Sequence, residues 1–117
     1  MKHKDFEAYP ERSVIKKTIA EAGTYYPDLN LASVFRIVAS GYATVIGTPK
    51  NPRDGQYLRL EMTSADSTAL NFSTVFHVNG AVIADGTHTG NDLLILEGWY
   101  DGDNSVWNMH ILGVKAA

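Results

Sequence analysis

A short, rigid turn followed at once by an alternating strand is the feature that most restricts the fold of this chain. The segment Thr48–Gln56 contains two prolines and an Asp-Gly pair. Proline fixes its own φ and pushes the preceding residue toward extended geometry, and glycine supplies the positive φ that a chain reversal needs. Directly afterwards, Leu58, Leu60 and Met62 alternate with polar side chains, which is typical of a half-buried β-strand. The stretch therefore predicts a structural turn before a strand, and the turn residues are Pro49, Pro52, Asp54 and Gly55.

The rest of the chain repeats this organisation, with short β-type runs separated by turn signals. Asn79-Gly80 is a favoured hairpin pair, and Asp101–Asn104 is a second turn between two apolar runs. Turn signals at intervals of roughly 8–12 residues are typical of a sandwich or barrel. We therefore expect an all-β fold, an antiparallel β-sandwich of jelly-roll-like type over residues 14–117, with residues 1–13 as an extended N-terminal arm. Ser13–Ala22 fits either an amphipathic helix or an edge strand protected by lysines, and the residues alone leave both open.

Composition excludes several classes of function. The 117 residues fit one domain, and the net charge of -3 opposes the basic face that nucleic-acid binding requires. No stretch approaches the roughly 18 apolar residues of a membrane span, and the N-terminus lacks the apolar core of a signal peptide. The absence of cysteine excludes thiol chemistry. We expect neither nucleic acid nor a membrane as a partner, and synthesis in the cytoplasm.

Motifs for catalysis or metal binding are missing from the sequence. The four histidines are scattered without metal-ligand spacing, and no Gly-x-Ser-x-Gly nucleophile motif occurs. Asp101–Asn104 offers oxygen ligands but lacks the further ligands of an EF-hand loop, so a hairpin turn is the favoured interpretation. We predict no catalytic residue, no metal site and no cofactor, and do not expect an enzyme.

Three aromatic residues flank the Asp101–Asn104 turn and are expected to be neighbours across a hairpin. They are Trp99, Tyr100 and Trp107. Aromatic side chains stabilise cross-strand pairs, anchor interfaces and stack on sugars. The residues predict a core or subunit interface first and a glycan-binding platform second.

The order of these features resembles a β-domain that recurs in virion proteins of tailed bacteriophages, in tail fibres and in head-associated proteins. The resemblance spans about residues 23–114 and includes an Asn-Pro-x-Asp-Gly-Gln turn. The residues that carry it are Tyr25–Leu29, Val34–Arg36, Ala43–Val45, Pro49–Gln56, Phe72–Phe76, Asn91–Leu94 and Ser105–Trp107. One departure is the segment Ser64–Thr68, where many relatives carry a Gln-Asp-x-x-Gly turn.

This resemblance implies a β-sandwich, often trimeric, without catalysis, and favours an extended strand over Ser13–Ala22. We therefore expect a virion structural protein, a capsid decoration (cement) protein that forms a homotrimer and contacts the major capsid protein or other virion proteins. Apolar side chains in the charged arm have no local core to enter, so Phe6, Tyr9 and Pro10 are expected arm contacts. Arg12 is the fourth expected contact of the arm. The alternative is a tail-fibre or head-fibre component that binds a host-surface glycan, and a polysaccharide-degrading enzyme is the least favoured hypothesis.

Overall fold

The computed structural model describes residues 14–39, 44–64, 69–84, 88–89 and 92–116, which form eleven strands. No helix occurs among these residues, and therefore none of the length and apolarity that crossing a membrane requires. The prediction of an all-β fold is confirmed. The predicted arm, with Phe6, Tyr9, Pro10 and Arg12, lies outside the described residues.

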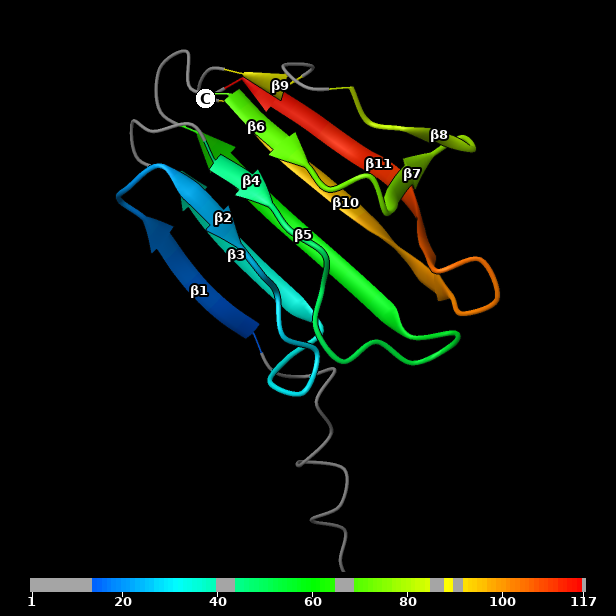
Figure 1. Cartoon of the computed structure of the whole chain (residues 1–117). Coiled ribbons are helices and arrows are strands. Elements are labelled where there is room, and N and C mark those ends of the chain that lie inside the picture. The colour runs from blue at the N-terminus through cyan, green and yellow to red at the C-terminus, as the bar shows by residue number, and fades with distance from the viewer. Residues whose placement is uncertain (1–13, 40–43, 65–68, 85–87, 90–91, 117) are drawn as a thin grey trace, which may run out of the picture.

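The strands form two hydrogen-bonded sheets (Figure 1). The first is seven-stranded, in the order β1 (Val14–Ile19), β3 (Val34–Ala39), β5 (Tyr57–Ser64), β10 (Asp92–Asp101), β11 (Val106–Ala116), β7 (Phe76–Val78) and β8 (Ala81–Val82). The second is four-stranded, in the order β2 (Gly23–Tyr25), β4 (Thr44–Ile46), β6 (Ala69–Phe72) and β9 (His88–Thr89).

The direction of the strands corrects the sequence-based prediction of an antiparallel, jelly-roll-like fold. From β1 to β6 the chain places each successive strand in the other sheet, so β1, β3 and β5 lie side by side in one sheet and β2, β4 and β6 in the other. A strand that returns to the same sheet after crossing the opposite one runs in its original direction, and both trios are therefore parallel. A jelly roll is built from antiparallel strands. Here β5–β10, β10–β11, β6–β9 and β7–β8 are the antiparallel pairs within the described residues.

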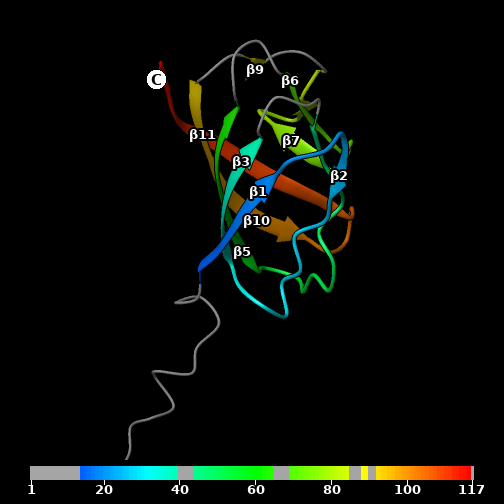
Figure 2. The same ribbon diagram turned by 90° about the vertical axis from the view of Figure 1, so that its left-hand side faces the viewer.

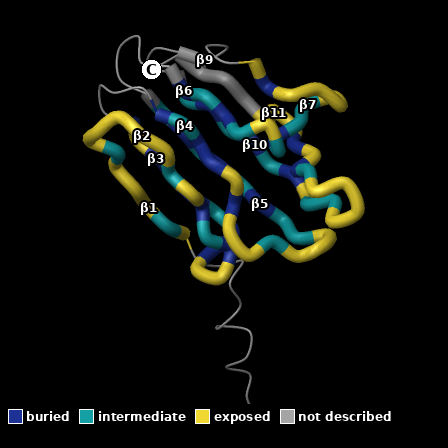
Figure 3. The backbone as a smooth tube through the Cα atoms, viewed as in Figure 1, coloured by how far each residue is buried: buried dark blue, intermediate teal, exposed yellow. Residues whose placement is uncertain are grey.

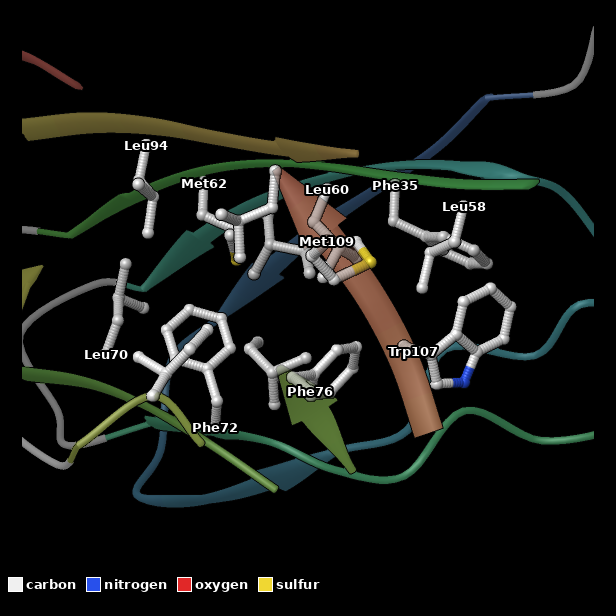
Figure 4. Packing of buried hydrophobic residues seen from close by; sticks show 14 of the residues in the cluster. Phe35, Leu58, Leu60, Met62, Leu70, Phe72, Phe76, Leu94, Trp107 and Met109 are labelled. Carbon is white, nitrogen blue, oxygen red and sulfur yellow. The ribbon is translucent and has the colours of Figure 1, made fainter. Parts of the chain in front are cut away.

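The core lies between the two sheets because strand residues alternate between faces. On β5, Leu58, Leu60 and Met62 are fully buried, as the alternation predicts, and the intervening side chains are half-buried on the other face (Figure 3). Leu70 and Phe72 come from the four-stranded sheet and point toward them (Figure 4). The buried residues of both sheets form a single cluster.

The structure decides between the helix and the edge strand that the residues of Ser13–Ala22 left open. Val14–Ile19 is strand β1, at the edge of the seven-stranded sheet, with Lys16 and Lys17 exposed. The predicted Asn79-Gly80 hairpin is confirmed, since both residues have positive φ, 54° and 81°, and join antiparallel β7 and β8. Positive φ at both central positions is the type I′ geometry that suits a two-residue hairpin.

Candidate functional site

The outer face of the seven-stranded sheet carries the richest group of polar and aromatic side chains in the described part of the chain. Strand register aligns these side chains in rows across neighbouring strands. Arg36 on β3 lies beside Glu61 on β5, and Arg59 on β5 lies beside Glu97 on β10. We name this surface the outer sheet face and define it by these rows, with residues Arg36, Tyr57, Arg59, Glu61, Glu97, Trp99, Asn108 and His110.

A continuous ion-pair network holds the charged side chains of this face. The Nε atom of Arg36 donates to Oε1 of Glu61 at 2.8 Å. The Nε atom of Arg59 donates to the other oxygen, Oε2, at 2.7 Å. Arg59 Nη1 also lies 3.7 Å from Oε1 of Glu97, and the Tyr57 hydroxyl donates to that same oxygen at 2.6 Å. Five side chains from three strands therefore support one another in fixed positions.

The electrostatics of this network keep its central carboxylate ionised. The hydrogen bond from Arg59 is the main cause that lowers the pKa of Glu61, with Arg36 adding to the effect and partial burial opposing it. The same hydrogen bond raises the pKa of Arg59. Burial raises the pKa of Tyr57, and its hydrogen bond to Glu97 adds to this. A general acid needs a carboxyl group whose pKa is raised, so Glu61 is arranged for ion pairing.

An exposed indole lies beside the network. Trp99 is 47% exposed, with its ring centroid 5.7 Å from that of Tyr57 and 6.5 Å from that of His110. Its cross-strand partner on β11 is the exposed Asn108. This part of the face therefore combines one accessible aromatic surface with hydrogen-bonding groups around it.

The structure divides the predicted aromatic group between two faces. Tyr100 and Trp107 are cross-strand partners with ring centroids 5.0 Å apart, as expected across the hairpin. Trp107 is 0% exposed, however, and belongs to the core, with its indole Nε1 unpaired among the described residues. For Trp107 the core interpretation is therefore confirmed, and the alternative of a surface platform is wrong, because its side chain has no exposed surface. Because neighbouring strand residues point to opposite faces, Trp99 could never have shared a face with Tyr100.

The predicted turn Thr48–Gln56 lies between β4 and β5 and acts as a structural clamp. Gly55 has φ of 79°, which favours glycine, and Pro49 is buried. Asp54 Oδ1 accepts a hydrogen bond of 2.8 Å from the Gly102 N–H. The Gly55 N–H donates to the Tyr100 carbonyl at 2.8 Å. The turn is therefore fastened to the distant β10–β11 hairpin.

The Asp101–Asn104 segment forms the predicted hairpin turn. Asp101 Oδ1 accepts from the backbone N–H groups of Asp103 and Asn104 at 3.0 and 3.2 Å, and Oδ2 accepts from the Asn104 side chain at 2.8 Å. The Asn104 side chain is the main cause that lowers the pKa of Asp101. Within the described residues, no group of three or more His, Asp or Glu side chains is placed to hold a metal ion.

For the outer sheet face, the sequence indicated the side chains of the central strand β5 but not the residues on neighbouring strands that bind them. The alternation of β5 already places Tyr57, Arg59 and Glu61 on one face. Glu97 stands inside an apolar run, and only the register of β10 brings it to Arg59. Comparisons with protein-family models, curated proteins and solved structures gave no match.

Proposed function

We propose that this chain is a structural protein of a tailed-bacteriophage virion, which decorates the capsid and stabilises the head through contacts between subunits. The outer sheet face is the observation that supports this most directly. Tryptophan, tyrosine and arginine are the residue types enriched at the energetic centres of protein interfaces, and Trp99, Tyr57 and Arg59 lie together on this face. Side chains already held by an ion-pair network lose little further rotamer freedom when a partner covers them.

The fold is suited to a mechanical role. We infer that the two sheets are the layers of a β-sandwich, since their inner side chains share one hydrophobic cluster. We also propose a homotrimer, which follows from the resemblance to virion β-domains. A two-layer body with a partly apolar outer face can add buried area between capsid subunits without any chemical step.

Capsid binding by full-length protein tests this proposal with a matched pair of variants. Trp99→Ala removes an aromatic ring from the outer sheet face, and Tyr26→Ala removes a ring of similar exposure, 49% against 47%, from the β2–β3 connection. We expect Trp99→Ala to weaken binding to capsids of the encoding phage by about tenfold or more, and Tyr26→Ala to leave it unchanged. Equal binding by both variants would remove the outer sheet face from this role.

Immunogold labelling of intact virions tests the location separately. Labels distributed over the head are the expected result. Labels confined to the tail would overturn the decoration role. Light scattering of the purified protein tests the trimer, and a monomer at micromolar concentration would contradict it.

The second candidate function is binding of a host-surface glycan at Trp99. An exposed indole flanked by hydrogen-bonding groups, here Asn108 and His110, is a surface on which a pyranose ring can stack. A glycan array should then give hits that disappear in Trp99→Ala and persist in Tyr26→Ala. An array without hits would remove this candidate.

A further inference from the structure

Two exposed sheet edges lie together on one side of the molecule. β1 ends the seven-stranded sheet and β2 ends the four-stranded sheet, and only residues 20–22 separate them in the chain. Figure 2 looks onto this side, with β1 and β2 in front of the strands that follow them. At their opposite ends the sheets finish in β8 and β9, each two residues long, whereas β1 has six. Very short edge strands resist pairing with another chain, and a six-residue edge remains open to it.

The inner side of the β1 edge is incompletely covered. Ile15 and Ile19 on β1 are only partly buried, although Phe35 and Ala39, their partners on β3, are 1% and 0% exposed. Ile19 also lines an open groove of about 470 Å³, which is formed by Lys17–Tyr25 at the end of β1 and the start of β2. The apolar surface of the core therefore extends to the β1 edge, where no further strand of the described structure covers it.

The charge of β1 selects the kind of strand that can pair with it. Lys16 and Lys17 are exposed, and Arg36 lies next to Lys16 on the outer sheet face. Two copies of β1 paired antiparallel about a twofold axis, in either of the two registers that overlap most, would place Lys16 opposite Lys16 or Lys17 opposite Lys17. Like charges directly opposite one another destabilise a strand pair. The lysines thus oppose self-pairing of β1 and favour an extended segment with acidic side chains.

We propose that the residue 5–8 segment of a second copy of this chain adds to the β1 edge as an extra antiparallel strand. This segment reads Asp5-Phe6-Glu7-Ala8, an acidic–aromatic–acidic pattern. In an extended strand Asp5 and Glu7 share one face and Phe6 takes the other. This inference rests on the proposed assembly role, because it joins one subunit to the next.

One register satisfies both faces of β1 at once. With Glu7 opposite Lys16, Asp5 lies opposite Thr18, so both acids are on the outer face and Glu7 is directly beside a lysine. Phe6 is then opposite Lys17 on the inner face, between the positions of Ile15 and Ile19, at the end of the groove that Lys17 lines. Recognition by backbone hydrogen bonds and alternate side-chain pockets is the usual mode of strand addition. Arms passed from one subunit to the next close into a ring when the rotation permits.

Charge exchange in the full-length protein tests this register. Glu7→Lys and Lys16→Glu each place like charges opposite one another, and we expect each to weaken self-association by about tenfold in sedimentation experiments. The double variant restores opposite charges and should recover the wild-type association. Glu11→Lys, which changes the same charge outside the segment, is the matched control and should behave as wild type. Single variants that associate like wild type, or a double variant no better than either, would overturn the proposal.

Disulfide trapping shows which copy supplies the strand, because the chain has no cysteine of its own. Opposed residues of antiparallel strands have Cα atoms within disulfide range. A mixture of an Asp5→Cys chain and a Thr18→Cys chain should form a mixed disulfide dimer. Asp5→Cys mixed with Thr63→Cys, a threonine on β5 in the sheet interior, should not. No mixed dimer, or a link only within one chain when both cysteines are present, would overturn the proposal.

These results separate the contact from the proposed function. Strand pairing without head labelling would keep the contact and remove the decoration role. Head labelling by a protein whose cysteines do not cross-link would keep the decoration role and remove the strand contact.

Discussion

Replacing Gly98 with alanine tests the packing of the central β10–β11 pair, on which the outer sheet face depends. Gly98 is buried on β10 and pairs with Met109 on β11. A Cβ atom there would lie 2.0 Å from the carbonyl oxygen of Asn108 and 2.7 Å from the Cα of Met109, whereas ordinary contact begins at 3.4 Å. Both obstacles are backbone atoms of the neighbouring strand. They can yield only if the two strands separate by roughly 1 Å or more, which a close-packed interior resists.

The size of the effect follows from what that separation breaks. Strand hydrogen bonds on either side of the Gly98–Met109 pair are lengthened, at about 1 kcal/mol each, and the overpacked core costs about 1–3 kcal/mol more. We expect Gly98→Ala to lower the free energy of unfolding by about 3 kcal/mol or more. Urea denaturation followed by tryptophan fluorescence measures this, because buried Trp107 reports on the same strand pair.

Gly47→Ala is the matched control for this experiment. Its Cβ atom would also be too close to other atoms, 2.6 Å from Tyr26 and 2.7 Å from Thr24, but these are side-chain atoms, and Tyr26 is 49% exposed. Side chains near the surface can rotate away, so we expect a loss of about 1 kcal/mol or less. Equal urea midpoints for the two variants would show that strand separation at Gly98 is not costly and would refute the reasoning.

Three further variants test other parts of the structure. Arg59 lowers the pKa of Glu61, so the ionised Glu61 stabilises the fold above the ordinary pKa of 4.5, and this stabilisation is lost as the pH falls through the folded-state pKa. Glu61→Gln should therefore reduce the loss of melting temperature with falling pH, and an unchanged dependence of melting temperature on pH would contradict this. Asp54→Ala removes the acceptor for the Gly102 N–H and should cost about 1 kcal/mol, with faster amide hydrogen exchange at Gly102; unchanged exchange would show that the clamp is unimportant. Trp107→Ala empties a fully buried site and should cost about 3–5 kcal/mol, and a urea midpoint within error of wild type would contradict its place in the core.

Strands and turns were predictable where their signals are local. The alternation of Leu58, Leu60 and Met62 with polar residues expresses burial on one face, and this period does not depend on which strands lie alongside. Asn79-Gly80 is similarly local, because few other residues adopt positive φ at two successive positions easily.

The direction of the strands and the residues that meet on the outer sheet face could not be predicted from local signals. An alternating strand has the same sequence pattern whether its neighbour is parallel or antiparallel, so the passage of β1–β6 back and forth between two sheets leaves no local mark. The ion-pair network likewise joins Arg36 to Glu61, 25 residues away, and Tyr57 to Glu97, 40 residues away. The opposite orientations of Trp99 and Tyr100, by contrast, could have been predicted, because consecutive residues of a strand point to opposite faces.

The amino-acid sequence by itself determined that this chain is all-β, where its clearest turns lie, and which side chains of β5 enter the core. These properties arise from φ preferences and from the two-residue period of a strand, which act over a few residues. Only the tertiary structure decided that β1 is an open edge, that Trp107 is buried while Trp99 is exposed, and that two arginines meet Glu61. Those outcomes depend on which strands become neighbours and in what register, and that choice is made by the packing of the whole core.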